Sequence, residues 1–294
     1  MSVPDIRLSF EALKAGIALH YQMKIKTVLS KGLFASGAIM LLFSLSSCKK
    51  EVFTSGVKNE FSLQSAANGA SYNIKVGLPA NYNSSDKYAT IYVLDGKEIF
   101  GFVANRCKEI SDNLAVKNVL VVSIGYGKDR SIDYTPTKVS SVTGGAPQFL
   151  NFIETQLIPK IEQDYSVDTT RGGRVILGHS YGGLFGGYAY AVNNKVFGNY
   201  ILLSPSFWFD NLVTLQMEKD NRTINKNKKQ LVFMGIGGAE ERERMQTPFE
   251  AFYQTLRDNY ADIKISKNLE KNAEHMGSRN PNIVKGLNYY FQNR

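Results

Sequence analysis

Apolar residues follow a strand-like pattern in some segments of the chain and a helical spacing in others. These segments alternate along most of the chain and predict a protein built of strands and helices. Two early segments, residues 60–65 and 72–78, alternate apolar and polar positions and are separated by the turn pair Asn68-Gly69. This pattern is typical of an antiparallel hairpin at the edge of a sheet. Continuous apolar runs, expected of central parallel strands buried on both faces, follow at residues 88–94, 118–124, 175–177, 200–203 and 231–236.

Segments with helical spacing separate these runs. Residues 148–163 place Phe149, Phe152, Ile153, Leu157 and Ile161 on one helical face. Residues 102–113 are also expected to be helical, with Cys107 as an inert core thiol. An alternating edge strand at 261–269 and a closing helix at 281–292 complete the pattern. Because strand and helix alternate throughout, the sequence predicts an α/β fold of three layers around a mostly parallel sheet with an antiparallel edge hairpin.

The run at 175–177 leads directly into Gly178-His179-Ser180-Tyr181-Gly182-Gly183, a strand followed by Gly-x-Ser-x-Gly. This is the layout of a nucleophile elbow, in which a serine stands at a sharp strand-to-helix turn. Glycines two residues before and after the serine are needed because the strand and helix backbones come too close for a Cβ. The sequence therefore predicts Ser180 as a nucleophile, with the backbone N–H of Tyr181 as one donor to the oxyanion.

An elbow serine predicts an acid and then a histidine further along the chain. The chain has three histidines. His20 lies near the N-terminus and His179 lies inside the elbow, so His275 is the only histidine after Ser180. It occupies a loop between the last predicted strand and the closing helix. We therefore expect His275 to be the general base.

The acid is open to three candidates. Glu240 and Glu241 follow the predicted strand at 231–236, where a carboxylate could orient the imidazole. Asp210 lies after the preceding strand and is the third candidate. The charged run at 240–244 could also be only the solvated start of a helix. We favour Glu240.

The chain resembles the putative-esterase branch of the α/β-hydrolases, which includes enterochelin (siderophore) esterases, esterase D and feruloyl esterases. The resemblance extends from about Phe61 onward and rests on Tyr92-Val93-Leu94-Asp95-Gly96, Arg130-Ser131-Ile132-Asp133-Tyr134-Thr135-Pro136, the elbow, Ser204-Pro205-Ser206-Phe207-Trp208, Gly237-Gly238-Ala239-Glu240 and His275. It implies an α/β-hydrolase fold, Glu240 as the acid, and a second oxyanion donor around Gly96 or Lys97.

Several residues near these motifs are candidates for substrate binding. Trp208 and Phe207 follow a core strand and are expected to line the pocket, although Trp208 could equally be a packing residue. Arg130 and Asp133 could hold a substrate or could fix their own loop by pairing with each other.

These residues indicate a serine esterase that works through an acyl-enzyme. Its small-molecule ester substrate is expected to be a siderophore trilactone, with a feruloyl or acetyl carbohydrate ester as the alternative. A lipase would need an apolar lid, whereas residues 221–229 are polar. A peptidase would usually bring an additional domain. A non-catalytic binding lipoprotein would have no use for Ser180 and His275.

The N-terminal segment indicates export and lipid anchoring. A basic start at Met23-Lys24-Ile25-Lys26 precedes an apolar run at 33–45 that is much shorter than the roughly 20 residues of a spanning helix. The run ends in Leu45-Ser46-Ser47-Cys48, which resembles a lipobox with Cys48 as the lipidated first residue. The expected location is the bacterial cell envelope, with the lipid anchor in the outer membrane and the protein on its periplasmic or its surface face.

The predicted organisation divides the chain into four parts. Residues 1–22 precede the true start at Met23, 23–47 form the signal peptide, 48–57 form a disordered polar tether, and 58–294 form the hydrolase domain.

Composition excludes several other functions. The formal net charge is +9, and Lys219 to Lys229 is rich in basic residues, which suits a soluble surface or attraction of anionic substrates. No basic stripe with interleaved aromatic residues occurs, so no nucleic-acid binding is expected. No zinc or haem motif and no Gly-rich phosphate loop occurs, so no cofactor or metal is expected. With Cys48 lipidated, Cys107 has no disulfide partner.

Overall fold

The computed structural model describes residues 50–294 except 128 and 227. The predicted upstream stretch, the signal peptide and Cys48 lie outside the described residues. Among the residues described, no helix is long and apolar enough to cross a bilayer. The same part of the chain contains no group of three or more histidine, cysteine or acidic side chains that could hold a metal ion.

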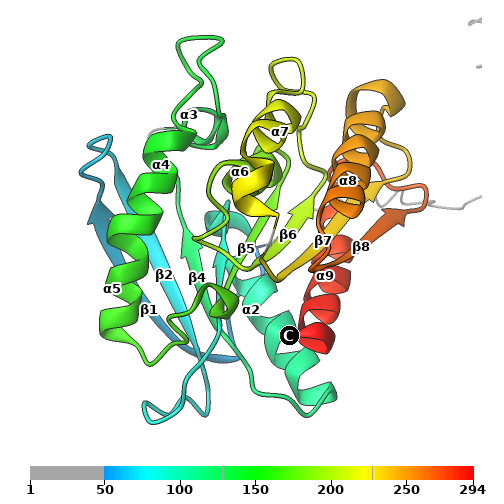
Figure 1. The fold of residues 1–294 in the computed structure, drawn as a ribbon. Helices are drawn as coiled ribbons and strands as arrows, with labels where there is room; N and C mark the ends of the chain where they lie inside the picture. Colours follow the sequence, from blue (N-terminus) through cyan, green and yellow to red (C-terminus); the bar gives the residue numbers. More distant parts are fainter. Residues whose placement is uncertain (1–49, 128, 227) are drawn as a thin grey trace, which may run out of the picture. The chain divides into compact units, whose positions relative to one another are not determined.

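An eight-stranded sheet forms the middle layer, in the order β1-β2-β4-β3-β5-β6-β7-β8 (Figure 1). The strands are β1 (Gly56–Gln64), β2 (Ser71–Pro79), β3 (Thr90–Val93), β4 (Leu120–Ile124), β5 (Arg174–His179), β6 (Asn199–Leu203), β7 (Gln230–Gly237) and β8 (Ile263–Glu270). β1 and β2 form an antiparallel pair at one edge, β2 joins β4 antiparallel, and the pairs from β4 to β8 are parallel. The predicted fold class and the edge hairpin are confirmed.

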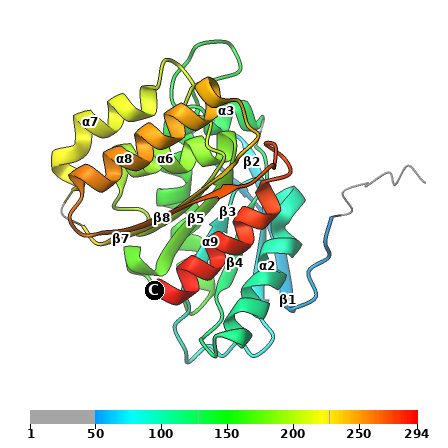
Figure 2. The same ribbon diagram turned by 90° about the vertical axis from the view of Figure 1, so that its right-hand side faces the viewer.

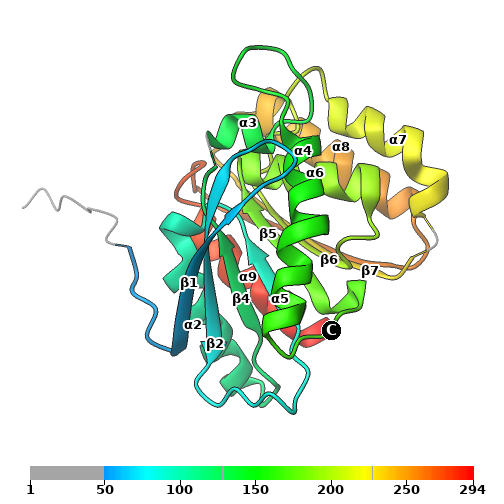
Figure 3. The same cartoon turned by 90° about the vertical axis from the view of Figure 1, so that its left-hand side faces the viewer.

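Helices cover both faces of the sheet (Figures 2 and 3). They are α2 (Gly96–Asn113), α3 (Arg130–Tyr134), α4 (Ala146–Phe152), the π-helical turn η1 (Ile153–Leu157), α5 (Ile158–Asp164), the 3-10 turn η2 (Arg171–Gly173), α6 (Tyr181–Asn193), α7 (Val213–Asn225), the π-helical turn η3 (Arg242–Gln246), α8 (Thr247–Asn259) and α9 (Arg279–Asn293). Side chains of α2 and α9 share one buried core with the sheet, and those of α4, α5, α6 and α8 share the other. The strands β3, β4, β6 and β7 are buried along their whole length, which explains their continuous apolar sequences.

Three helices occupy stretches to which the sequence analysis assigned no helix. α3 lies in the motif at 130–136, α7 covers part of the basic stretch at 219–229, and α8 follows the charged run after β7. In α8, Phe249, Phe252, Tyr253 and Leu256 are buried and follow the spacing of an amphipathic helix. The signal for α8 was therefore present in the sequence.

Both π-helical turns precede a helix that has a proline in its first turn. η1 leads into α5, which contains Pro159, and η3 leads into α8, which contains Pro248. Because proline has no N–H to donate, the α-helical hydrogen-bond pattern cannot continue through it unchanged. The helix predicted over 148–163 is confirmed, with η1 as a local irregularity.

The expectation of a disordered tether is wrong for residues 51–57. The Glu51 carboxylate accepts hydrogen bonds from Asn105 Nδ2 at 2.7 Å and Arg106 Nη2 at 3.0 Å, and the Phe53 ring lies 5.3 Å from that of Phe100. A Cβ at Gly101 would lie 1.9 Å from the Glu51 carbonyl oxygen, so this glycine permits the close approach. The segment therefore lies along α2 and leads into β1, which begins at residue 56.

Cys107 lies in α2 and is a buried core residue, as expected. Burial raises the pKa of its thiol well above the ordinary value. A thiol that stays protonated is a weak nucleophile.

Candidate active site

Ser180 stands at a sharp turn between β5 and α6. Its backbone has φ 61° and ψ −119°, a conformation that residues with a side chain rarely adopt. A Cβ at Gly178 would lie 2.3 Å from the carbonyl oxygen of Gly182, which explains why glycine is needed there. The predicted strand–turn–helix geometry is therefore present, and strain of this kind is typical of functional sites.

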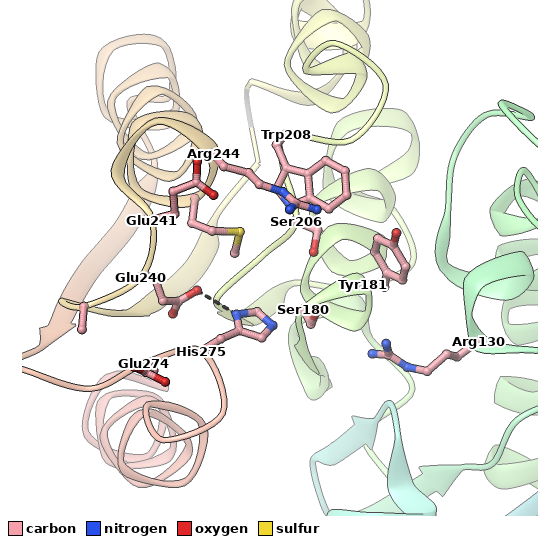
Figure 4. Close-up of a pocket in the computed structure, with 12 residues that line it drawn as sticks. Arg130, Ser180, Tyr181, Ser206, Trp208, Glu240, Glu241, Arg244, Glu274 and His275 are labelled. Carbon is pink, nitrogen blue, oxygen red and sulfur yellow. Dashed lines mark hydrogen bonds and ion pairs between the residues drawn. The ribbon is translucent and has the colours of Figure 1, made fainter. Parts of the chain in front are cut away.

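Three candidate catalytic side chains meet at the carboxyl edge of the parallel strands. Ser180 follows β5, Glu240 follows β7, and His275 lies between β8 and α9. A cavity of about 480 Å³ opens there and is lined by all three, together with Tyr181, Trp208 and Arg130 (Figure 4). This volume lies within the usual range for small-molecule sites, and ligands of open α/β sheets commonly bind at this edge.

His275 is hydrogen-bonded to Glu240. The distance from His275 Nδ1 to Glu240 Oε2 is 2.7 Å. Because an ionised carboxylate can only accept, Nδ1 carries the proton and the lone pair of a neutral ring lies on Nε2. In Figure 4 the imidazole lies between Glu240 and Ser180, with its second nitrogen on the side of Ser180. This is the orientation that a general base for Ser180 requires.

Glu240 is buried, and its second carboxylate oxygen is also satisfied. Oε1 accepts hydrogen bonds from the Gly237 N–H at 2.8 Å and from Ser204 Oγ at 2.6 Å. Burial alone would raise the pKa of Glu240, but the hydrogen bonds from His275, Ser204 and Gly237 outweigh it and hold this pKa below the ordinary value. Glu240 is therefore an ionised carboxylate in a buried place.

The other two candidates for the acid do not contact His275. The Glu241 side chain is exposed. Asp210 Oδ2 accepts a hydrogen bond from Thr137 Oγ1, on the loop that follows α3. The geometry therefore favours Glu240 over both alternatives.

Two buried serines that the sequence analysis did not select support the acid. Ser204 follows β6, and Ser278 precedes α9, with its Oγ 3.2 Å from that of Ser204 and 3.4 Å from Glu240 Oε1. Ser204 lies in the quoted Ser-Pro-Ser motif, which could have drawn attention to it. Ser278 had no such signal, because only the folded chain brings it to Glu240.

His179, the residue before Ser180, contacts the loop that carries His275. Its Nε2 donates a hydrogen bond to the His275 carbonyl oxygen at 3.0 Å, and the two rings lie 4.6 Å apart. Since a carbonyl oxygen only accepts, the proton of the neutral ring lies on Nε2. Burial, followed by the proximity of His275, lowers the pKa of His179 to about 3. His179 therefore stays neutral at ordinary pH and fixes the backbone of the His275 loop.

We expect His179 to make the protein less stable as the pH falls. A histidine in the unfolded chain binds a proton below about pH 6.5, whereas folded His179 binds one only near pH 3. The unfolded state therefore binds more protons in this window, and the free energy of unfolding falls by up to about 1.4 kcal/mol per pH unit as the pH decreases. Urea unfolding of wild type and His179→Gln between pH 6.5 and 4.5 measures this, since glutamine keeps an N–H donor but does not titrate. If the free energies of unfolding of the two proteins changed equally with pH, the low pKa of folded His179 would be contradicted.

Arg130 forms an ion pair with Asp95, whereas the sequence analysis left open whether Arg130 and Asp133 hold a substrate or pair with each other. Arg130 Nε and Nη2 donate to the two Asp95 carboxylate oxygens at 2.8 and 3.0 Å. Asp133 instead accepts a hydrogen bond from the Tyr72 hydroxyl at 2.9 Å. Asp95 lies at the end of the β3 loop, and its carboxylate also lies beside Gly182 of the elbow. The ion pair thus joins the β3 loop to α3 next to the nucleophile turn.

The predicted second oxyanion donors lie next to this ion pair. Gly96 is buried and Lys97 is exposed, both in the first turn of α2 directly after Asp95. Neither is among the residues that line the cavity. Their role as oxyanion donors stays a prediction.

Of the two predicted aromatic pocket residues, only Trp208 lines the cavity. Phe207 is fully buried and packs on Phe252 with 4.3 Å between ring centroids, so its assignment to the pocket is wrong. Successive residues of this segment point in opposite directions, one into the core and one into the cavity. Trp208 is contacted by Arg244, whose guanidinium carbon lies 4.0 Å from the ring centroid. The sequence analysis did not select Arg244.

Known proteins resemble this chain in sequence and in structure. The Ferri-bacillibactin esterase BesA of Bacillus subtilis is 29% identical over 217 residues, which are 63% of this chain and 72% of that protein. The Siderophore triacetylfusarinine C esterase of Aspergillus fumigatus is 24% identical over 219 residues, covering 68% and 75% of the two chains. The crystal structure of the BES protein from Bacillus cereus superposes with a TM-score of 0.72 and 27% identity over 82% of this chain and 97% of that one.

The model of a protein family described as "Putative esterase" matches residues 65–278. The match spans the elbow, the acid loop and the His275 loop. The chain therefore belongs to the Putative esterase family and is an esterase.

Proposed function

We propose that this protein hydrolyses the ester bonds of a siderophore, with Ser180 as nucleophile, His275 as general base and Glu240 as the acid that orients it. The observation that carries the proposal is the 2.7 Å contact between His275 and Glu240 beside the elbow serine in one cavity. Two similar proteins are named as esterases of siderophores, which supports this class of substrate.

The reaction would proceed in two halves through an ester on Ser180. Ser180 Oγ attacks the carbonyl carbon while His275 Nε2 takes its proton, and the C–O bond to the alcohol then breaks as the imidazolium protonates the leaving oxygen. Water attacks the acyl-enzyme in the same way and releases the acid. The Tyr181 N–H would stabilise the oxyanion, and a donor of this kind is worth about 3 kcal/mol of barrier.

Rates on a set of esters test the substrate class. Purified protein is expected to hydrolyse a tricatecholate trilactone with a kcat/KM at least about a hundred-fold above that for feruloyl or acetyl sugar esters, because the best substrate gains transition-state binding from the whole cavity. Short p-nitrophenyl esters report basal esterase activity. Faster hydrolysis of the feruloyl sugar would favour a carbohydrate esterase instead.

Glu240→Gln is expected to reduce kcat by between about ten-fold and ten-thousand-fold, the range from weakened orientation to loss of the triad. Glutamine keeps the size of the side chain, but it removes the charge that stabilises the imidazolium. Steady-state kinetics on a p-nitrophenyl ester measure the change. Glu241→Gln and Asp210→Asn are matched controls, because neither contacts His275, and both are expected to stay near wild type. A crippling effect of Asp210→Asn would reassign the acid.

We also propose that the protein is a lipoprotein of the bacterial cell envelope, anchored through Cys48. The support is the sequence Leu45-Ser46-Ser47-Cys48 after a basic and apolar leader. Cys48→Ser is expected to move the protein from the membrane fraction to the soluble fraction or to block its processing, since two or more acyl chains anchor a protein stably. Mass spectrometry of the membrane-extracted protein checks this. An intact N-terminus with an unmodified Cys48 would contradict the proposal.

A further inference from the structure

Arg244 and Trp208 stack on each other in the wall of the cavity opposite His275. Arg244 lies in η3, and its guanidinium covers the Trp208 ring at 4.0 Å (Figure 4). A guanidinium in this position is attracted by the negative face of the indole. Its second face and its edge N–H groups remain available to a bound molecule.

The charge of Arg244 is not neutralised by an acidic partner within the described residues. Arg244 forms no ion pair within the described residues, although the carboxylates of Glu241 and Glu274 line the same cavity. The other arginine of the cavity, Arg130, makes a two-pronged ion pair with Asp95. Arg244 is therefore the cavity's cation that is free to meet an anion.

The loop that follows Trp208 has a strained backbone. The three residues Asp210, Asn211 and Leu212 have φ values of 44°, 51° and 65°, which is a left-handed conformation unusual for residues other than glycine. A hydrogen bond from Thr137 to Asp210 fixes this stretch. Strain of this kind persists where the surrounding structure enforces it, and it clusters at sites that hold ligands. The π-helical turn that carries Arg244 is a second irregularity of a kind frequent at functional sites.

We propose that Arg244, stacked on Trp208, is the specificity-determining residue that binds the anionic ring oxygens of an aryl group on the substrate. The guanidinium presents several N–H donors and a positive charge, which suit anionic oxygens such as those of an iron-bound catecholate. A neutral ester of the same shape gains nothing from this charge. The assignment rests on the proposed siderophore esterase function, which it deepens by naming the residue that selects for charge.

The test compares a ferric tricatecholate trilactone, whose catecholate oxygens are anionic, with the same trilactone methylated at every catechol oxygen, which is neutral and binds no iron. Arg244→Gln is expected to raise KM for the catecholate substrate by about ten-fold to a hundred-fold with kcat little changed, because charged hydrogen bonds of this strength are lost. The rise in KM for the methylated substrate is expected to be below about three-fold. Arg244→Lys, which keeps the charge but loses the planar stack, is expected to fall between wild type and Arg244→Gln.

Arg242→Gln is the matched control, since Arg242 is exposed on the same turn, carries the same charge and does not line the cavity. It is expected to behave as wild type on both substrates. Salt adds an independent readout, because screening should raise KM for the catecholate substrate in wild type and much less in Arg244→Gln.

Equal effects of Arg244→Gln on both substrates, or an equal effect of Arg242→Gln, would overturn the role of Arg244. A wild-type protein that hydrolyses p-nitrophenyl esters but neither trilactone would instead refute the proposed substrate, and the assignment of Arg244 with it.

Discussion

Ser180→Ala is expected to abolish hydrolysis of short p-nitrophenyl esters, with less than a few per cent of the wild-type kcat remaining. The substitution removes the oxygen that we propose forms the acyl-enzyme, and the hydrogen bond between His275 and Glu240 in the same cavity does not involve it. Residual rates in such variants come from binding and oxyanion stabilisation alone. Steady-state kinetics measure the loss, and incubation with a fluorophosphonate followed by mass spectrometry measures labelling of Ser180.

The loss of activity identifies Ser180 as the nucleophile only if the Ser180→Ala variant folds normally. Ser180→Ala is expected to show the same circular dichroism spectrum as wild type, since the hydroxyl makes no contact that the core requires. A variant that keeps substantial activity, or that is still labelled at the same peptide, would show that the nucleophile is another residue.

His275→Ala is expected to be nearly as damaging as Ser180→Ala. Without the imidazole the hydroxyl of Ser180 keeps its proton and is a poor nucleophile, and the leaving alkoxide has no proton donor. Ser180 and His275 act in the same step, so losing either one removes the same catalytic contribution. The Ser180→Ala, His275→Ala double variant is therefore expected to be about as slow as either single variant. The kcat values of all four proteins on one ester form the cycle that measures this.

A loss of activity in His275→Ala could also come from misfolding, because the variant leaves the buried Glu240 carboxylate without one of its hydrogen bonds. Ser204 and Gly237 still donate to Glu240 Oε1, so we expect the fold to persist. A double variant that is about a thousand-fold slower than each single variant would show that Ser180 and His275 act independently, against the proposed mechanism.

The sequence was sufficient for the parts of the structure that depend on local pattern. The buried strands can be predicted from apolar runs because both of their faces are covered. The elbow can be predicted from its glycines because no Cβ fits where Gly178 approaches Gly182. The order of serine, acid and histidine then selected Ser180 and His275. Glu240 needed the resemblance to a family, since three carboxylates follow neighbouring strands.

Apart from the missed helices, the differences between prediction and structure concern contacts between segments far apart in the chain. The sequence offers Asp133, three residues away, as a partner for Arg130, and only folding shows that Asp95, 35 residues earlier, receives two of its hydrogen bonds. Trp208 and Phe207 look equivalent in sequence, and only the position of α8 decides that Phe207 belongs to the core. The polar residues before β1 carry no apolar pattern of their own, so their contact with α2 depends on a glycine fifty residues later.

The backbone of Ser180 carries a further consequence, for the balance between stability and activity. A residue with a Cβ at φ 61° and ψ −119° costs about 1–3 kcal/mol relative to a relaxed conformation. The same scaffold with a relaxed turn at this position would be harder to unfold, but its serine would no longer project from the end of β5 toward His275. Mutations that stabilise this protein by relaxing the elbow are therefore expected to be lost under selection for activity, so that gains in thermal tolerance would have to come from the helices and loops remote from it.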